Sequence, residues 1–149
     1  MLHYFQTSRT QPKLVLAAAL FLLLSAVSSG CTPKEIAIQN LGLINEARAE
    51  AGAAPLQWDE QAATKAQAWA ERMAAANTMS HSEVTDGMGT EWNHLGENVG
   101  YGKSIQVVHG NFLNSQRHYD TMVASKYTSA GVGVAFSGKV MFVAEVYRG

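Results

Sequence analysis

The sequence predicts a layered α+β domain that follows an N-terminal export signal. Three features support this prediction. Apolar residues recur at helical spacing in two segments between residues 36 and 77. Two β-rich runs, AGVGVAF and KVMFVAEVY, lie near the C-terminus on either side of Ser137-Gly138, which is a hairpin signal. An apolar run at residues 14–27 precedes all of them. Helices first and an antiparallel hairpin last favour a layered α+β arrangement.

The first 30 residues have the composition of a secretory signal peptide. Arg9 and Lys13 are the only Lys, Arg, Asp or Glu residues before the apolar run, and small residues follow it. The run is shorter than the stretch of about 20 apolar residues that spans a membrane. We therefore expect residues 1–30 to be removed on export.

Cys31 is the only cysteine of the chain. The residues SSG before it resemble a bacterial lipobox, with Ser28 in place of the usual leucine. This resemblance implies that Cys31 is acylated, anchors the mature chain in a membrane, and leaves residues 31–35 as a short tether to a domain at residues 36–149. The alternative is an ordinary signal peptide followed by a free thiol, which is a liability in an oxidising compartment. Thr32 follows the cysteine, which by the same resemblance points to the outer membrane and periplasm if the host is Gram-negative.

The composition excludes some partners and one means of stabilisation. The formal net charge is −1, and the chain after residue 31 has no cluster of lysines and arginines, so we expect no nucleic-acid partner. Without a second cysteine no disulfide can form within the chain, and the fold must depend on a packed core. We expect a monomer whose protein, lipid or small-molecule partner in the envelope is unidentified.

Two helices are predicted in the first half of the domain. Leu41, Ile44 and Ala47 predict a helix over residues 36–51, which Gly52 ends. An extended connection over residues 53–58 leads to the second helix. Asp59 is a predicted N-cap of that helix and Asn77 a predicted C-cap. Its predicted buried stripe consists of Ala62, Ala66, Trp69 and Met73.

The second half is predicted as a loop, a strand, two short helices and the hairpin. Residues 79–94 have no hydrophobic period and form a long loop, and such loops are often functional. A short strand is predicted over residues 98–101. Ser104 is a predicted cap for a helix that carries Ile105, Val108 and Phe112, and a helical turn follows over residues 117–124.

An ordered set of short motifs gives the family resemblance. These are N-x-x-R at Asn45 and Arg48, then L-x-W-D, MSHS, GEN, S-x-x-H and Y-T-x-x-G-V-G-V-A. Together they resemble the CAP superfamily of cysteine-rich secretory, antigen 5 and pathogenesis-related proteins, in particular its disulfide-free bacterial members. The resemblance implies a three-layer α-β-α sandwich with a central antiparallel sheet, and a cleft lined by histidines and glutamates.

Three residues of this chain match the family's cleft by position. They are His81 of MSHS, Glu97 of GEN and His118 of SQRH. The second glutamate of the eukaryotic pattern is missing, because Asn114 and Ser115 stand in its place. Two imidazoles and a carboxylate could bind a divalent metal such as zinc and leave a position open for water. The same groups without a metal could exchange protons near neutral pH.

Several functions are compatible with these residues. The first is a binding module whose cleft holds a metal or a small ligand without turnover. The second is a metal-dependent hydrolase of peptide or cell-wall material, with His81 and His118 as ligands and Glu97 as third ligand or general base. A third is lipid carriage, which needs an apolar groove. Glu97 could also be only a loop carboxylate that bonds nearby backbone. Serine hydrolase chemistry has no support, because the chain has no G-x-S-x-G elbow.

The remaining polar and aromatic residues are predicted to be structural. Asn45 and Arg48 are expected to tie the first helix to a neighbouring segment. Glu145 is expected on the solvent-facing side of the last strand. The other expectations are a loop position for His94, an exposed or half-buried helix position for His109, core positions for Trp58 and Trp69, and either role for Trp92.

Overall fold

The structure is a computed structural model that describes residues 30–149. The predicted signal peptide, apart from Gly30, therefore lies outside the described residues. Cys31 is exposed at the start of the described chain. No helix within residues 30–149 combines the length and the apolar character that crossing a membrane requires.

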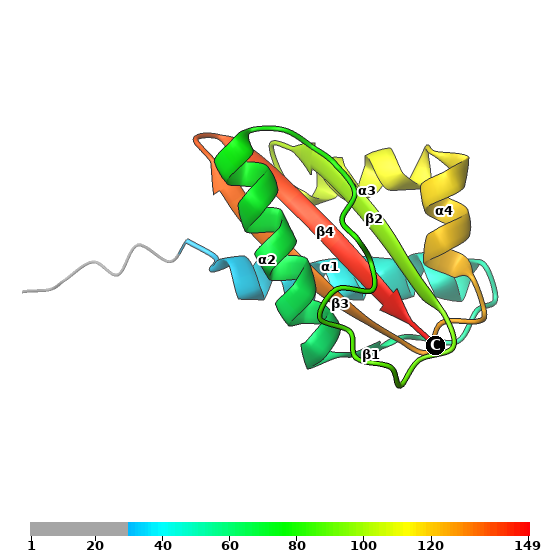
Figure 1. Cartoon of the computed structure of the whole chain (residues 1–149). Coiled ribbons are helices and arrows are strands. Elements are labelled where there is room, and N and C mark those ends of the chain that lie inside the picture. Colours follow the sequence, from blue (N-terminus) through cyan, green and yellow to red (C-terminus); the bar gives the residue numbers. More distant parts are fainter. Residues whose placement is uncertain (1–29) are drawn as a thin grey trace, which may run out of the picture.

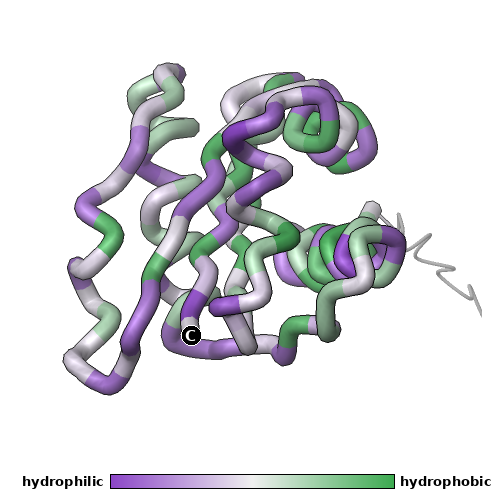
Figure 2. Tube along the Cα trace, turned by 90° about the vertical axis from the view of Figure 1, so that its right-hand side faces the viewer, coloured by the Kyte–Doolittle hydropathy of each residue, from purple (hydrophilic) through white to green (hydrophobic). Residues whose placement is uncertain are grey.

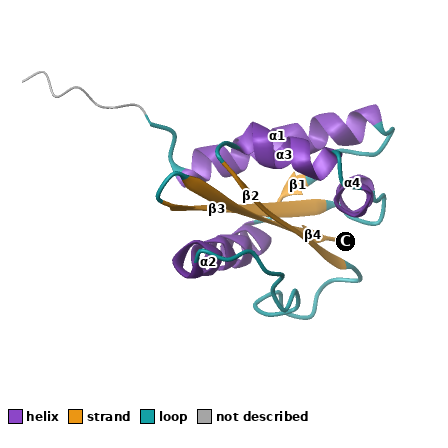
Figure 3. Cartoon of the chain, turned by 90° about the horizontal axis from the view of Figure 1, so that it is seen from above, coloured by secondary structure: helices purple, strands orange, loops and turns teal. Residues whose placement is uncertain are grey.

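The described chain forms the three layers that the family resemblance implies. A four-stranded sheet lies between α2 on one face and α1, α3 and α4 on the other (Figure 3). The helices are α1 (Pro33–Glu50), α2 (Glu60–Ala76), α3 (Ile105–Leu113) and α4 (Gln116–Val123). The strands are β1 (Gln57–Trp58), β2 (Leu95–Gly102), β3 (Ser129–Ser137) and β4 (Val140–Arg148). The predicted α+β class and α-β-α layering are confirmed.

The sheet is mixed rather than wholly antiparallel. Its strand order is β1-β3-β4-β2, and both β2 and β3 run antiparallel to β4. The short β1 instead pairs in parallel with the first two residues of β3. The expected C-terminal hairpin is present, and Gly138 turns it with a φ of +59°. Within the described chain β4 is the one strand with a long partner on each side.

Helix α1 begins at Pro33, three residues before the expected start. The Thr32 side chain accepts a hydrogen bond from the backbone N–H of Glu35, and the Glu35 carboxylate accepts one from the backbone N–H of Thr32. This reciprocal capping box fixes the first turn, and proline suits the first helical position. Figure 2 shows α1 nearly end-on, with hydrophobic and hydrophilic residues around its circumference.

Helix α2 is capped as the sequence predicts and packs closely on the sheet. Asp59 accepts hydrogen bonds from the first turn, and Asn77 ends the helix with a φ of +48°. Two glycines of β3 make the close approach possible. A Cβ on Gly131 would lie 1.9 Å from the backbone nitrogen of Ala63, and one on Gly133 would lie 2.2 Å from the carbonyl carbon of Ala66. Backbone therefore meets backbone where α2 crosses β3 (Figure 1).

The three tryptophans border the core instead of filling it. Trp58, Trp69 and Trp92 are each half-buried and pack against the outside of a buried cluster. Each indole N–H is bonded close by, to the Glu60 carboxylate, the Ser80 carbonyl and the Gly89 carbonyl respectively. Trp58 and Trp69 are therefore less buried than the core positions expected for them. An indole carries a polar N–H, which favours a half-exposed position where a hydrogen-bond partner is near.

The β3 edge of the sheet is partly closed by a side chain. The amide of Gln67, on α2, donates to the carbonyl of Val134 at 3.0 Å and accepts from its backbone N–H at 3.0 Å. Gln67 thus replaces the two hydrogen bonds that a neighbouring strand would provide at that residue. Together with β1, it covers part of an edge that otherwise exposes unpaired backbone.

Candidate functional site

The candidate site is organised by three consecutive residues of β2, the motif GEN. Gly96 lies directly over the Tyr127 ring, and a Cβ there would come within 2.3 Å of the Tyr127 hydroxyl oxygen. The side chain of Glu97 bonds the loop over residues 77–94, whereas that of Asn98 bonds the carbonyl of His118 in α4. Because side chains alternate along a strand, neighbouring residues reach opposite faces. The strand expected over residues 98–101 is longer than predicted, since β2 begins at Leu95 and includes Glu97.

Glu97 holds the segment His81-Ser82 through three contacts. One carboxylate oxygen lies 2.8 Å from His81 Nδ1 and accepts from the backbone N–H of Ser82 at 2.9 Å. The other oxygen accepts from the Ser82 hydroxyl. The Glu97 side chain is only 4% exposed, whereas that of His81 is 52% exposed. The carboxylate is therefore an internal anchor, and the imidazole is the part of the pair that solvent reaches.

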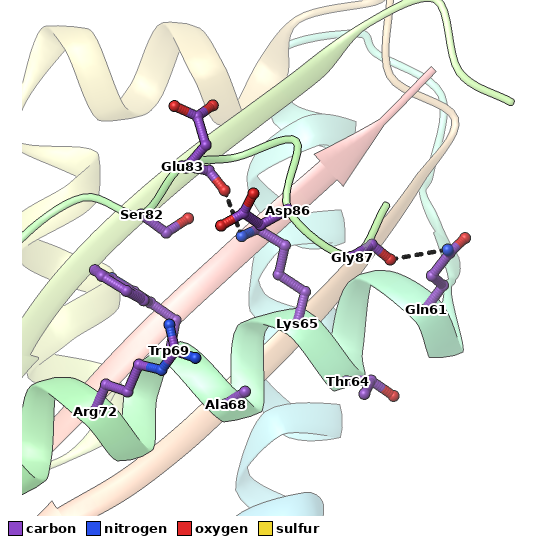
Figure 4. Close-up of a pocket in the computed structure, with 10 residues that line it drawn as sticks. All are labelled: Gln61, Thr64, Lys65, Ala68, Trp69, Arg72, Ser82, Glu83, Asp86 and Gly87. Atoms are coloured by element: carbon purple, nitrogen blue, oxygen red, sulfur yellow. Dashed lines mark hydrogen bonds between the residues drawn. The ribbon is translucent and has the colours of Figure 1, made fainter. Parts of the chain in front are cut away.

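The loop that carries His81 is also tied to α2. Lys65 donates to the Glu83 carbonyl at 2.6 Å, and Gln61 donates to the Gly87 carbonyl at 2.9 Å (Figure 4). Trp69 donates to the carbonyl of Ser80, directly before His81. These contacts surround a surface hollow of about 400 Å³ between α2 and the loop. A long loop without regular structure is thereby held at several points, which positions His81.

His118 lies in the first turn of α4 and is held separately. Its Nδ1 is 2.8 Å from the Ser115 hydroxyl, and its ring packs on Phe112 with 4.9 Å between centroids. Its backbone carbonyl accepts from the Asn98 amide at 3.1 Å. Burial lowers the pKa of His118 below its usual value, and the nearby positive charges of His81 and Arg117 lower it further. The surroundings therefore favour the neutral imidazole.

The structure thus brings the three predicted site residues to one region but bonds only two of them directly. His81 and Glu97 are in contact, and His118 is linked to Glu97 through the adjacent Asn98. Within residues 30–149, no three histidine, cysteine, aspartate or glutamate side chains converge closely enough to form a metal cluster. Both histidines use Nδ1 for a protein contact, which leaves Nε2 of each as the atom available to a ligand.

Beneath the site lies a buried carboxyl group that the sequence analysis placed wrongly. Glu145 is fully buried in β4, not solvent-facing. It accepts from the Asn40 amide at 2.6 Å, from the Asn98 amide at 3.2 Å, and from the Tyr147 hydroxyl. Burial raises the pKa of Glu145, against the lowering effect of these three donors. The Glu145 carboxyl group therefore connects β4 to Asn40 of α1 and to Asn98 of β2. Asn98 in turn bonds the backbone carbonyl of His118 in α4.

Three further expectations can be compared with the structure. Asn45 bonds the backbone of Leu56, and Arg48 donates to four backbone carbonyls, so both tie α1 to neighbouring segments as predicted. His109, expected to be exposed or half-buried, is buried at 8% exposure, and burial lowers its pKa. His94 lies in the loop before β2 as expected, is exposed, and exchanges backbone hydrogen bonds with Gly149.

Comparison with known proteins identifies the family of the chain. The sequence pattern of the cysteine-rich secretory protein family matches residues 41–147, which include all three predicted site residues. The chain belongs to the CAP family. A curated relative, pathogenesis-related protein 1A of Nicotiana tabacum, is 30% identical over 115 residues. This alignment covers 77% of the chain but only 59% of the tobacco protein, and the match to pathogenesis-related protein 1C covers 55% of that protein.

Solved structures share the CAP fold. An outer surface protein from Borrelia burgdorferi superimposes with a TM-score of 0.71 at 16% identity, covering 79% of this chain and 95% of that one. An extracellular SCP-domain protein from Bacillus anthracis gives a TM-score of 0.62 at 24% identity, covering 81% and 45%. The family is one of secreted and extracellular proteins.

Proposed function

We propose that the protein is a lipid-anchored binding module of the bacterial cell envelope, in which His81 and His118 contact the ligand and Glu97 orients His81. One observation carries this proposal: the nearly buried Glu97 carboxylate is bonded to His81 Nδ1 and twice to Ser82, which leaves the exposed side of the His81 ring free. A carboxylate that fixes an imidazole in this way selects its tautomer and its direction.

The same geometry favours binding over hydrolysis. A general base must take a proton from water or substrate within hydrogen-bond reach. The Glu97 oxygens already accept three hydrogen bonds, and the side chain is almost inaccessible to solvent. Acting as a base, or as a metal ligand, would require these contacts to break. Glu97 is therefore better suited to hold the loop than to react.

A divalent metal remains compatible with part of the donor set. The Nε2 atoms of His81 and His118 are the nitrogens that could hold a zinc ion, and Glu97 would support His81 from behind. Since Glu97 is not free to serve as third ligand, other positions would fall to water or a bound molecule. When bound, the ion would supply Lewis acidity. The role of the chain's own residues is to fix the two imidazoles.

Isothermal titration of the purified protein with zinc chloride tests this site. We expect zinc to bind in competition with protons, since a ligating histidine must be neutral, so affinity should rise from about pH 5.5 to about pH 7.5. His118→Ala should abolish binding. Glu97→Gln should weaken it by about 10- to 100-fold, which is typical of a residue that supports a ligand. The exposed His94→Ala variant is the control and should bind as the wild type does.

Two results would contradict the proposed site. One is zinc affinity that does not change in either His118→Ala or Glu97→Gln, and the other is an equal loss in His94→Ala. Circular dichroism of each variant separates loss of binding from loss of fold. A preserved far-UV spectrum with weakened binding assigns the effect to the site.

Lipid anchoring through Cys31 is the second part of the proposed function. In support, Cys31 is exposed and α1 begins two residues later, so an acyl group there would not disturb the core. Two or more acyl chains give stable membrane attachment. We expect the wild type to enter the detergent phase in a Triton X-114 separation and Cys31→Ser to stay in the aqueous phase or remain unprocessed. Normal partition of Cys31→Ser into the detergent phase would disprove anchoring at this residue.

A further inference from the structure

The outer edge of β2 has no strand beside it in the described part of the chain. In the strand order β1-β3-β4-β2, β2 is terminal and pairs only with β4. The opposite edge of the sheet is partly covered by β1 and by Gln67. The β2 edge is also where the candidate site lies, because Glu97 is part of this strand.

The register identifies which backbone groups face outward. His94 and Gly149 exchange both of their backbone hydrogen bonds, at 3.0 and 2.9 Å. The pairing of β2 with β4 continues in step from there to Gly102 without a bulge. Because the pattern alternates along an antiparallel pair, the odd-numbered residues of β2 direct their N–H and C=O groups away from β4. The carbonyl of Leu95, the first of them, is bonded by the Tyr127 hydroxyl at 3.2 Å.

The next outward-facing residues are Glu97, Val99 and Tyr101. No hydrogen bond from elsewhere in residues 30–149 reaches their backbone N–H or C=O groups on the outer side of β2. Three alternate residues of an edge strand present the donors and acceptors that an added strand uses. Their spacing therefore fits an extended polypeptide.

A hollow of about 300 Å³ lies directly against this edge. Val99 and Tyr101 line it together with Met79 from the loop and Phe112 from α3. His118 and Ser115 form its end at α4. Tyr101 and Met79 are 54% and 44% exposed, so two large apolar residues border the hollow at the surface. Backbone groups beside an apolar hollow are the two requirements of strand addition, since the backbone gives affinity and the hollow receives a side chain.

The exposed charges next to the edge include two cations. Lys103 follows the end of β2, and Arg117 precedes His118 on α4, and both side chains are exposed. The carboxylate that β2 itself carries, that of Glu97, is 4% exposed and already accepts three hydrogen bonds. An acidic segment is therefore the complementary partner.

We infer that the ligand of this protein is an extended, acidic peptide segment that adds to the sheet along β2, with one apolar side chain in the hollow beside His118. This inference builds on the proposed function, because it gives the chemical class of the ligand that His81 and His118 would meet. It does not require a metal. The peptide backbone pairs with Glu97, Val99 and Tyr101, and its acidic side chains lie near Lys103 and Arg117.

The experiment begins with a peptide probe. A random heptapeptide display library is panned on the immobilised mature protein in EDTA, and the peptide recovered is synthesised in two forms. One form is unmodified. The other is N-methylated at alternate residues, which removes the backbone N–H donors along one edge of the extended peptide and leaves its side chains unchanged. We expect the N-methylated form to bind at least about tenfold more weakly. We also expect the unmodified peptide to slow hydrogen exchange at the amides of Glu97, Val99 and Tyr101.

A matched pair of variants tests the protein side. Tyr101→Pro removes one outward N–H, and proline is tolerated where an edge N–H faces away from the sheet. Tyr101→Ala removes the same ring but keeps the N–H. We expect Tyr101→Pro to bind about tenfold more weakly than Tyr101→Ala.

Several results would overturn the inference. They are equal affinity of the two peptide forms, equal affinity of the two variants, protection confined to other amides, or no selected peptide with a Kd below about 1 mM. The three amides could also become protected in the absence of peptide, to a degree that grows with protein concentration. That result would show that a second copy of the chain occupies the edge, and it would also overturn the inference. Because EDTA excludes zinc from the peptide experiment, the two tests are independent. Peptide can bind even if zinc does not, and zinc can bind even if no peptide does.

Discussion

Replacing Glu145 by alanine is the most informative perturbation of the core below the site. The carboxyl group is fully buried, and three donors converge on it from Asn40, Asn98 and Tyr147. Asn98 keeps a second partner, the carbonyl of His118, but the other two donors lose their only hydrogen-bond acceptor. The Oδ1 atom of Asn40 already lacks a partner among the described residues, so that side chain would be left wholly unbonded.

The size of the effect follows from these contacts. Each buried donor left without an acceptor costs about 1–3 kcal/mol, so two of them, with the cavity left by the side chain, give about 3–5 kcal/mol for Glu145→Ala. Glu145→Gln should cost less than about 1 kcal/mol. Its carbonyl can accept from Asn98 and Tyr147, and its amide can donate to Asn40 if that side chain turns over. The glutamine variant would then satisfy the Oδ1 atom that is unbonded in the wild type.

The pH dependence provides an independent check on Glu145. Burial raises its pKa in the folded state above the ordinary value of 4.5. A raised folded pKa means that the folded protein holds the proton more tightly, so this stabilisation is complete below pH 4.5 and is lost as the pH rises through the folded pKa. Burial lowers the pKa of His109 and His118, which acts in the opposite sense and destabilises the fold below their usual value of 6.5.

Urea denaturation followed by tryptophan fluorescence at several pH values between about 4 and 9 measures these differences. The two histidines contribute equally to the wild type and to Glu145→Gln, so subtracting one unfolding free energy from the other isolates Glu145. We expect the glutamine variant to gain relative stability as the pH rises. A difference that stays constant with pH, or equal destabilisation by alanine and glutamine, would refute the account of Glu145 as a proton-holding centre of the network.

Two further predictions concern the contact between α2 and the sheet. Gly133→Ala should destabilise the domain by about 3 kcal/mol or more, because its Cβ would lie 2.2 Å from backbone atoms of α2. The control Gly42→Ala, with open space around its Cβ in a helix interior, should stabilise by about 0.5–1 kcal/mol, and thermal unfolding compares the two. Trp69→Ala should cost about 2 kcal/mol, less than a core tryptophan, since the ring is half-buried. Trp69→Phe should recover more than half of that loss in urea, and a cost above about 4 kcal/mol for Trp69→Ala would place the ring in the core.

Local signals in the sequence were sufficient for most elements but not for the contacts between them. Capping residues such as Asp59, Ser104 and Asn77 act within one turn, so their roles can be predicted without the fold. The early start of α1 was missed because its capping box was overlooked, although Thr32, Pro33 and Glu35 are a recognisable signature.

In the candidate site, too, the residues could be predicted from the sequence but the contacts between elements could not. His81, Glu97 and His118 were placed through motif resemblance, whereas their roles depend on Ser82 and Asn98, which join elements far apart in the chain. Glu145 was misplaced because strict in–out alternation was assumed. The run VMFVAEV is apolar at both odd and even positions, which is typical of a strand covered on both faces. A glutamate within such a run must be buried on one face or the other.

The unequal edges of the sheet set an upper limit on assembly. A strand that pairs with β2 ends the growth of the sheet on that side, unless the partner has a second unpaired strand edge to which another strand can add. At the far side, Gln67 occupies the hydrogen-bonding positions of Val134, and β1 covers the start of β3. Head-to-tail stacking of copies needs two open edges per molecule, whereas within residues 30–149 only β2 has three successive outward-facing residues, Glu97, Val99 and Tyr101, without a backbone partner on that side. Pairing through β2 would therefore close after one partner, which would keep a protein with an exposed β-edge from forming fibres.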